Sequence, residues 1–370
     1  MSNKIAILGA NGFVGSRLIE MMHLEAGGDT LRPVVRSFTS LARLARFDLD
    51  WRIADACDTG AMTKAFEGCD SVVNLIVADP DIIVRSATAS YEAAMAAGVK
   101  RMVFMSSASV HGQAPAPGTD ESSPLHTGHV FAYNNAKVRA ERALTALRAK
   151  NPVELVILRP SIVFGPRSRW ITDIADQLLA GTAALLEGEP GICNSIYVDN
   201  LIGAIRLALT VPGADRGVYL VGDDERVTWE EFHGRIAAAL GLDMAEVVRI
   251  GAPQFHHGGL RETLGGLKAS RPVQAVLPLF PKRLKESVKA GIRSLRAPEP
   301  ASPWALPGKT SPPLSEEMCV LQSCRVQLPF TRAKAELGYV PTLSFDEGMR
   351  RSIGWLEFAG YPVRINPKNL

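Results

Sequence analysis

Two side chains four residues apart, Tyr133 and Lys137, have the types and spacing that proton exchange with an alcohol or a ketone requires. Residues four apart lie on one face of a helix, so the phenol and the ammonium would be neighbours. A nearby cation stabilises a phenolate, so the tyrosine can take a proton from an alcohol or return one to an alkoxide. The pair therefore predicts acid–base chemistry, although the same spacing also occurs where a packed tyrosine lies beside a solvated lysine.

A serine that could join this pair follows the apolar run 102–105. Ligands bind at the carboxyl ends of parallel strands, so hydroxyls at 106–109 would face the site. Ser107 is expected to hydrogen-bond the reacting oxygen, whereas Ser106 and Ser109 fit better as turn hydroxyls bonded to backbone. Three histidines of the same region are expected to be structural or solvated, although one could donate a proton in an epimerase or reductase; they are His111, His126 and His129.

A nucleotide site is predicted at residues 9–15, where a glycine-rich segment follows an apolar run and opens a helical pattern. Gly9 permits a tight turn, Gly12 lets the backbone approach a diphosphate, and Gly15 permits close helix packing. The anion would lie on the unpaired N–H groups of the helix N-terminus. Asn11, Phe13 and Val14 complete the expected contact segment.

The second strand of the nucleotide-binding pattern ends at Arg36, where an NAD site usually has an acid for the ribose hydroxyls. An arginine suits a 2′-phosphate instead, so the sequence favours NADP over NAD, the alternative being a solvated surface arginine. Asp55 could accept a hydrogen bond from the adenine amino group, or it could cap the following turn. Ala56 and Leu75 are expected to line the same nucleotide site.

The elements that must position these residues alternate between β-branched runs and helical patterns over the first 160 residues. This alternation predicts an α/β fold with a Rossmann-type, doubly wound parallel sheet. Strands are expected at 4–8, 31–35, 51–54, 71–77, 102–106 and 153–159, with helices beginning near Phe13, Thr39, Gly60, Asp81 and Val130.

The remaining residues are expected to form a smaller C-terminal substrate-binding lobe. Helices are predicted at 170–180, 199–209, 229–240 and 345–358, and short strands near 217–221 and 247–250. The predicted domains are therefore an NAD(P)-binding domain at 1–160 and a substrate-binding lobe at 161–370. Part of the second range is expected to return to the NAD(P)-binding domain. Residues 251–328 change to proline-rich, glycine-rich and basic stretches and are interpreted as an insertion.

Composition excludes several classes of function. The 370 residues are 46% hydrophobic with a formal net charge of +3, so a sizeable core is expected and nucleic acid is not an expected partner. The five cysteines are widely spaced and without metal-ligand patterns, so no metal site is predicted and a reducing cytoplasm is favoured. No apolar stretch is long enough to span a bilayer, and no targeting segment is recognised.

With the glycine loop, Ser107 and Tyr-x-x-x-Lys in this order and spacing, the chain resembles the extended short-chain dehydrogenase/reductase superfamily, including its epimerase/dehydratase branch. Further matching segments are 107–112, 159–166, 197–200 and 335–341. The resemblance implies catalytic roles for Ser107, Tyr133 and Lys137, with Lys137 also binding the nicotinamide ribose. It also implies that Pro160 and Val163 lie beside the nicotinamide.

The chain departs from the nucleotide-sugar 4,6-dehydratases at the two positions after the serine, where Ala108 and Ser109 replace an acidic pair. Dehydration is therefore not expected. Ile162 replaces an asparagine that commonly contacts a sugar-nucleotide diphosphate, and it offers no hydrogen bond. Without this asparagine, the segment 159–166 resembles 3β-hydroxysteroid dehydrogenases as much as sugar epimerases. The sequence therefore does not decide the class of substrate.

The resulting hypothesis is hydride transfer at a secondary alcohol or ketone, either to a released product or transiently in an epimerisation, on a nucleotide sugar or a lipid-linked substrate. The alternative is a nucleotide-binding structural or regulatory protein. Residues 282–296 place apolar side chains on one stripe flanked by cations, which predicts either peripheral contact with an anionic membrane or packing on the protein. A homodimer through the helices beginning near Asp81 and Val130 is common in the family.

Overall fold

The computed structural model describes residues 3–25, 29–252, 255 and 314–364. Met1–Gly251 and Glu317–Leu370 belong to one compact unit, and residues 252–316 form a second unit. Residues 282–296, for which membrane contact is predicted, lie outside the described residues. Within the described residues, no helix is long and apolar enough to cross a membrane.

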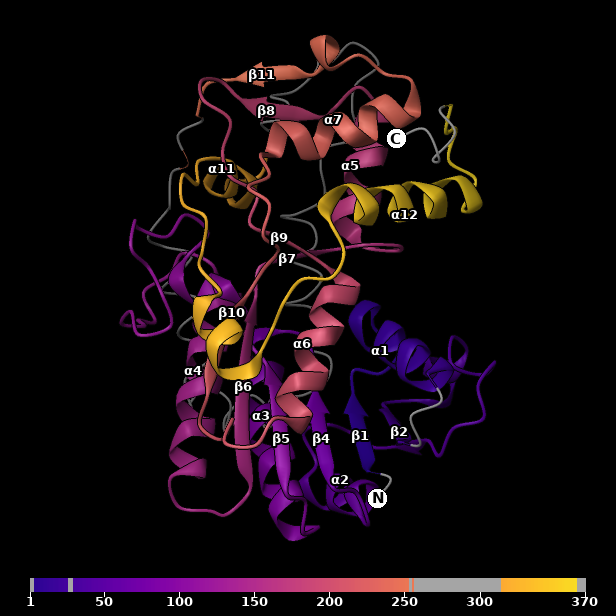
Figure 1. Ribbon diagram of the computed structural model, residues 1–370, viewed down its shortest axis with the longest axis vertical. Coiled ribbons are helices and arrows are strands. Elements are labelled where there is room, and N and C mark those ends of the chain that lie inside the picture. Colours follow the sequence, from indigo (N-terminus) through magenta and orange to yellow (C-terminus); the bar gives the residue numbers. More distant parts are fainter. Residues whose placement is uncertain (1–2, 26–28, 253–254, 256–313, 365–370) are drawn as a thin grey trace, which may run out of the picture. The chain divides into compact units, whose positions relative to one another are not determined.

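A seven-stranded parallel sheet with the order β10-β6-β5-β4-β1-β2-β3 forms the base of the first unit (Figure 1). Its central strands are continuous apolar runs that are buried on both faces, as parallel strands require. The strands are β1 Lys4–Leu8, β2 Thr30–Val35, β3 Arg52–Ile53, β4 Ser71–Asn74, β5 Arg101–Met105, β6 Glu154–Pro160 and β10 Val218–Val221.

Helices cover both faces of this sheet. Helices α1 Phe13–Leu24 and α6 Val198–Thr210 share one apolar core with alternate strand residues such as Ile7 and Val73. Helices α2 Thr59–Phe66, α3 Pro80–Ala96 and α4 Ala132–Arg148 share the opposite core with residues such as Leu8 and Val72. The predicted α/β Rossmann-type, doubly wound fold is thus confirmed.

Two predicted elements of this domain differ in the structure. The helix expected near Thr39 is a short 3₁₀ helix, η1 Phe38–Leu41, because the backbone N–H groups here bond the carbonyl three residues back, as Ser40 bonds Ser37 at 3.0 Å. The strand expected at 71–77 ends at Asn74, whose side-chain oxygen accepts the Ile76 N–H at 3.0 Å and turns the chain.

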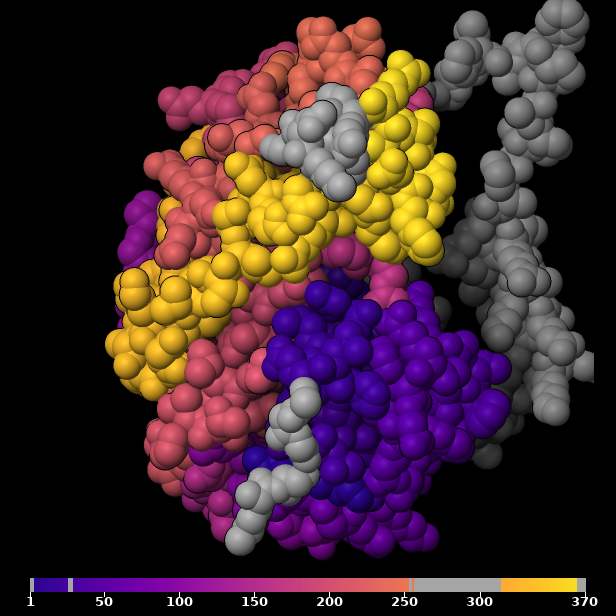
Figure 2. Space-filling model, turned by 45° about the vertical axis from the view of Figure 1, so that its right-hand side comes forward, coloured from indigo at the N-terminus to yellow at the C-terminus, as the bar shows by residue number. Residues whose placement is uncertain are grey.

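The lobe is built around α5 Arg169–Leu179, α7 Trp229–Leu240 and α12 Phe345–Phe358. Two small parallel sheets belong to it, β7 Ile162–Phe164 with β9 Ser195–Tyr197, and β8 Ala184–Leu186 with β11 Val248–Ile250. Residues 314–364, orange and yellow in Figure 2, include α11 Glu316–Gln322 and the π-helix η5 Ala333–Leu337. Strands β7, β8 and β9 have three residues each and were not predicted, whereas β11, equally short, was expected near 247–250.

Some residues beyond 160 belong to the main sheet and to the layer that covers it. Strand β10 pairs with β6 in the main sheet, and α6 covers the face that α1 also covers. The predicted limits 1–160 and 161–370, and the insertion at 251–328, stay predictions.

Candidate active site

The first two turns of α4 place Tyr133 and Lys137 at the carboxyl edge of the sheet. Lys137 is fully buried, and its Nζ donates to the Met105 carbonyl at 2.7 Å and to the Ile76 carbonyl at 3.4 Å. These carbonyls stand at the end of β5 and just beyond β4, so two strands fix the ammonium. The Nζ lies 5.7 Å from the centre of the Tyr133 ring, and the predicted pair therefore shares one face of one helix.

Burial shifts the pKa values of both groups away from their ordinary values. It lowers the pKa of Lys137 to about 8, against the opposing charge of Glu141. It raises the pKa of Tyr133 to about 12, against the opposing interaction with the Ser107 side chain. At neutral pH the tyrosine is therefore a phenol and the lysine an ammonium, which is the pair needed to give a proton to an alkoxide.

Ser107 follows β5 and precedes a 3₁₀ helix, η2 Ala108–His111. Its oxygen accepts the Ser109 N–H at 3.2 Å and the Ser109 hydroxyl at 2.9 Å, while it also interacts with Tyr133. Ser106 does not bond backbone as expected: its hydroxyl donates to the buried carboxylate of Glu141. The serine expected at the reacting oxygen is thus brought beside the tyrosine.

A buried ion pair supports α4 one turn beyond Lys137. Arg159 donates to Glu141 at 3.0 Å and 2.6 Å, and its Nη1 lies 3.1 Å from His111 Nε2. Burial, with Arg159 adding to it, lowers the pKa of His111 to about 4, so this histidine is neutral at physiological pH. His129 bonds the Val110 carbonyl through Nε2 at 3.0 Å. Glu141 was not singled out from the sequence, although its position four residues after Lys137 was a usable signal.

The glycine loop forms the expected close turn between β1 and α1. Gly9 has φ +73°, and a Cβ there would lie 2.9 Å from the Leu75 carbonyl oxygen. A Cβ on Gly15 would lie 2.3 Å from the Gly9 oxygen, so α1 packs directly on the loop. Gly12 is the N-cap of α1, and no side chain caps the helix. The N–H groups of the first turn, which belong to Phe13, Val14 and Gly15, are thus left for an anion.

The other residues predicted at the cofactor lie along the same edge of the sheet. Arg36 is exposed just after β2, and Asp55 follows β3. Asp55 Oδ1 accepts the Cys57 N–H at 2.9 Å, which is the turn-capping alternative. Pro160 ends β6 and Val163 lies in β7, beyond the end of the central strands. Ala56 is next to Asp55, and Leu75 lies against Gly9.

Arg43 was missed by the sequence reasoning. Its Nη1 donates to the carbonyl of Asn11 in the glycine loop at 3.2 Å, and no carboxylate pairs with it in the part of the chain that the structure describes. It stands seven residues after Arg36 in a segment expected to be an ordinary helix, so no pattern marked it. The glycine loop therefore has a cation, Arg43, bonded to its backbone.

The residues present fit a dinucleotide. An uncapped helix N-terminus, a loop that tolerates no Cβ at Gly9 or Gly15, and nearby arginines are the features that a diphosphate requires. Across the described ranges, no group of three or more His, Cys, Asp or Glu side chains is arranged to hold a metal ion.

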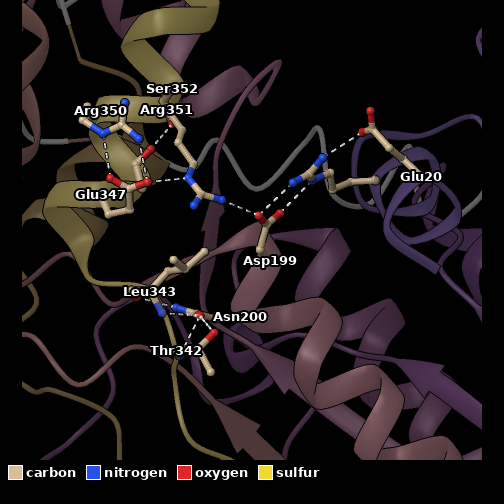
Figure 3. A network of polar contacts seen from close by, with 11 residues as sticks. Glu20, Asp199, Asn200, Thr342, Leu343, Glu347, Arg350, Arg351 and Ser352 are labelled. Carbon is tan, nitrogen blue, oxygen red and sulfur yellow. Dashed lines mark hydrogen bonds and ion pairs between the residues drawn. The ribbon is translucent and has the colours of Figure 1, made fainter. Parts of the chain in front are cut away.

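The lobe is tied to α1 and to its own C-terminal helix through Asp199 and Asn200 at the start of α6 (Figure 3). Asp199 accepts hydrogen bonds from Arg17 of α1 at 2.7 Å and 2.8 Å and from Arg351 of α12 at 3.2 Å. Asn200 Nδ2 donates to Asp223 Oδ1 and to the Leu343 carbonyl, each at 2.8 Å. These two adjacent residues thus hold three parts of the chain that are distant in sequence.

Together, the doubly wound sheet, the glycine loop and the Tyr-x-x-x-Lys helix define a nucleotide-binding protein of the extended short-chain dehydrogenase/reductase type. Residues 5–222 match the model of the NAD dependent epimerase/dehydratase family, and the chain belongs to this family.

Individual relatives are distant. The chain is 28% identical over 232 residues to N-acetyl-alpha-D-glucosaminyl-diphospho-ditrans,octacis-undecaprenol 4-epimerase of Escherichia coli O157:H7, covering 59% of this chain and 67% of that protein. It is 23% identical over 396 aligned positions to 3beta-hydroxysteroid-dehydrogenase/decarboxylase isoform 1 of Arabidopsis thaliana, covering 98% and 81%.

A solved dTDP-glucose 4,6-dehydratase of Streptomyces venezuelae, with NAD bound, is similar in fold, with a TM-score of 0.68 and 18% identity over 96% of this chain and 97% of that one. The family match supports an NAD-dependent enzyme of the short-chain type, and the solved structure shows the same fold. They do not exclude dehydration, because dehydratases share the fold.

Proposed function

We propose that the protein is an oxidoreductase or epimerase that transfers a hydride at a secondary alcohol or ketone, with Tyr133 moving the proton. The observation that carries this proposal is Lys137, a fully buried ammonium that two backbone carbonyls hold 5.7 Å from the Tyr133 ring. Holding an ammonium away from water destabilises the folded chain, and proteins maintain such groups where function uses them.

In the proposed mechanism, the bound dinucleotide supplies or accepts the hydride. The Tyr133 phenol gives its proton to the substrate oxygen in reduction, and takes it back in oxidation. The Ser107 hydroxyl donates a hydrogen bond to the same substrate oxygen and orients it. Lys137 lowers the free energy of the phenolate that forms when the proton has left.

NADP is the proposed cofactor form. Arg36 lies exposed after β2, where an acid would bind the ribose hydroxyls in an NAD site, and Arg43 reaches the glycine loop from the following segment. Two guanidinium groups suit a 2′-phosphate, which NAD lacks.

A nucleotide sugar or a lipid-linked secondary alcohol is the proposed substrate class. The similarity to a lipid-linked sugar epimerase supports this class, and so does the similarity to a steroid dehydrogenase.

Elimination of water is not part of the proposal, because Ala108 has no acid or base and Ser109 donates its hydroxyl to Ser107. No amide is available at Ile162 for a sugar diphosphate.

The substitution Tyr133→Phe tests the proposal, because it removes the phenol oxygen and keeps the ring. We expect turnover of alcohols, ketones and sugar nucleotides to fall at least about 100-fold, while the Kd for NADPH changes less than about threefold. Product stereochemistry and NADPH absorbance would be followed together, since an epimerase shows no net change in absorbance.

The matched control is Tyr361→Phe, which removes a phenol whose hydroxyl bonds Asp176 at 2.9 Å, outside the site. Full activity of the Tyr133→Phe variant would refute the mechanism. Tight dinucleotide binding without turnover in the wild type would favour the alternative, a nucleotide-binding structural or regulatory protein.

A further inference from the structure

Arg167 adopts a conformation that its side chain does not favour. It lies two residues beyond Gly165, in the turn between β7 and α5, with φ 71°. Among the described non-glycine residues, only Arg167 and Arg216 have positive φ. The turn packs closely on Val198 and has no room for a side chain at Gly165, because a Cβ added there would lie 2.7 Å from Val198 Cγ1. Strained backbone of this kind is often retained at ligand sites.

The Arg167 side chain leaves the lobe and reaches the glycine-loop helix. Its Nη2 donates to Ser16 Oγ at 2.8 Å, and the Ser16 hydroxyl donates to the Gly12 carbonyl at 2.7 Å. Ser16 is buried in the first turns of α1. A guanidinium from residue 167 is thus connected through one hydroxyl to the N-cap of the helix proposed to bind the diphosphate.

The charges around Arg167 are unbalanced. Arg17 and Arg46 each pair with Glu20 at 2.9 Å, whereas no carboxylate pairs with Arg167 or Arg43 within the described parts of the chain. Burial and then the neighbouring Arg43 lower the pKa of Arg167. Two guanidinium groups from different segments therefore bond the glycine loop and the first turns of the uncapped helix α1, and Glu20 is a carboxylate whose charge acts on Arg167 without forming an ion pair with it.

We propose that Arg167 contacts a phosphate of the bound dinucleotide, so that the lobe contributes a cation to the nucleotide site. The inference rests on the proposed function, because it takes the dinucleotide at the glycine loop as given. The ligand chemistry is a phosphate oxygen, which either the diphosphate or a 2′-phosphate can supply. A guanidinium donates to either in the same way.

The test is Arg167→Gly, which removes the side chain and suits the positive φ. Urea unfolding should show that the variant is at least as stable as the wild type. Weaker dinucleotide binding could then not be caused by misfolding. We expect its Kd for NADPH, measured by fluorescence titration, to rise about 10- to 100-fold. The dependence of binding on salt concentration should become shallower.

The matched control is Arg216→Gly, the same substitution at the other strained arginine, whose side chain is 67% exposed and distant from the glycine loop in the sequence and the sheet. It should leave the Kd unchanged. Weaker binding of NADH and NADPH alike would assign the contact to the diphosphate, and weaker binding of NADPH alone to the 2′-phosphate.

An unchanged Kd for both dinucleotides in Arg167→Gly would overturn the inference. If the wild type bound neither dinucleotide, the proposed function itself would fail, and the two failures are therefore distinguishable. The variant Arg167→Lys keeps the charge but not the forked donor, and it should recover part of the affinity.

Discussion

Lys137 is the residue at which local chemistry and folding stability oppose each other. Its ammonium is completely buried, and its two hydrogen-bond acceptors are uncharged carbonyls. Carbonyls compensate an ammonium less well than a carboxylate does, which is why burial lowers its pKa to about 8. The nearest acid, Glu141, is already engaged by Arg159.

A pH dependence of stability follows from this shift in the pKa of Lys137. Below about pH 8 the lysine carries its proton in both states, and burial of the charge destabilises the fold by a constant amount. Between about 8 and the ordinary value of 10.5 only the unfolded state keeps the proton, so the wild type gains stability as pH rises. Over this pH window, the free energy of unfolding of the wild type should rise by about 3 kcal/mol relative to that of Lys137→Met.

Urea unfolding at pH 7, 8, 9 and 10 measures this difference. Lys100→Met is the control, because that lysine is 79% exposed and pairs with Asp70 at the surface. A difference between wild type and Lys137→Met that stayed constant over the pH range would contradict the prediction.

At the residue scale, the sequence predicted the pair and its serine, because four-residue spacing and the order of motifs are visible along the chain. It did not predict Glu141, Arg43 or Arg167 as neighbours of the site. Glu141 had a usable local signal in its spacing from Lys137, but the contacts of all three join residues 18, 32 and 151 positions apart and depend on how the segments pack.

At the scale of elements, the contact between β1 and α1 leaves no room for a side chain at Gly15. Gly15 lies so close to the loop that an added Cβ would meet two backbone atoms, the Gly9 oxygen at 2.3 Å and the Ala10 Cα at 2.9 Å. Backbone cannot move aside as a flexible side chain can, so the whole helix would have to shift.

The substitution Gly15→Ala should therefore displace α1, weaken NADPH binding at least about 100-fold and lower the free energy of unfolding by about 3 kcal/mol. Gly354→Ala in α12 is the matched control, because no atom lies within 4 Å of its added Cβ. That change should stabilise the helix by about 1 kcal/mol or less. Similar losses in both variants, measured by urea unfolding and titration, would count against the packing argument.

Among the elements, long periodic segments were predicted well and short ones poorly. The residues of helix α4 and strand β1 follow their periodic pattern, whereas η1 has only four residues, too few for such a pattern. Strand β4, in turn, is ended by a single side chain at Asn74. Side-chain hydrogen bonds of this kind leave no periodic signal.

Over the whole molecule, Asp199 is the charge that joins the sheet to the lobe. It is buried, and it accepts from Arg17 and from Arg351, which lie 182 and 152 residues away. Replacing it by asparagine nearly preserves shape but removes the carboxylate that the two arginines share, which leaves Arg17 paired with Glu20 and Arg351 with Glu347.

Asp199→Asn should lower the free energy of unfolding by about 2 kcal/mol, less than for a fully buried pair because both arginines are partly exposed. The control Asp173→Asn removes an exposed carboxylate that pairs with Arg169 at 3.3 Å, and it should change stability by less than about 0.5 kcal/mol. Equal effects of the two substitutions in urea unfolding would contradict this role for Asp199.

The same region has a consequence for how ligands influence each other. Ser16 and Arg17 are successive residues of α1. Arg167 donates a hydrogen bond to Ser16, and Arg17 donates one to Asp199; these partners lie 151 and 182 residues further along the chain. A dinucleotide bound at this end of α1 and a substrate bound at the lobe would both act on these two hydrogen bonds. Any cooperativity that these bonds transmit is reciprocal, so each ligand must change the affinity for the other by the same factor.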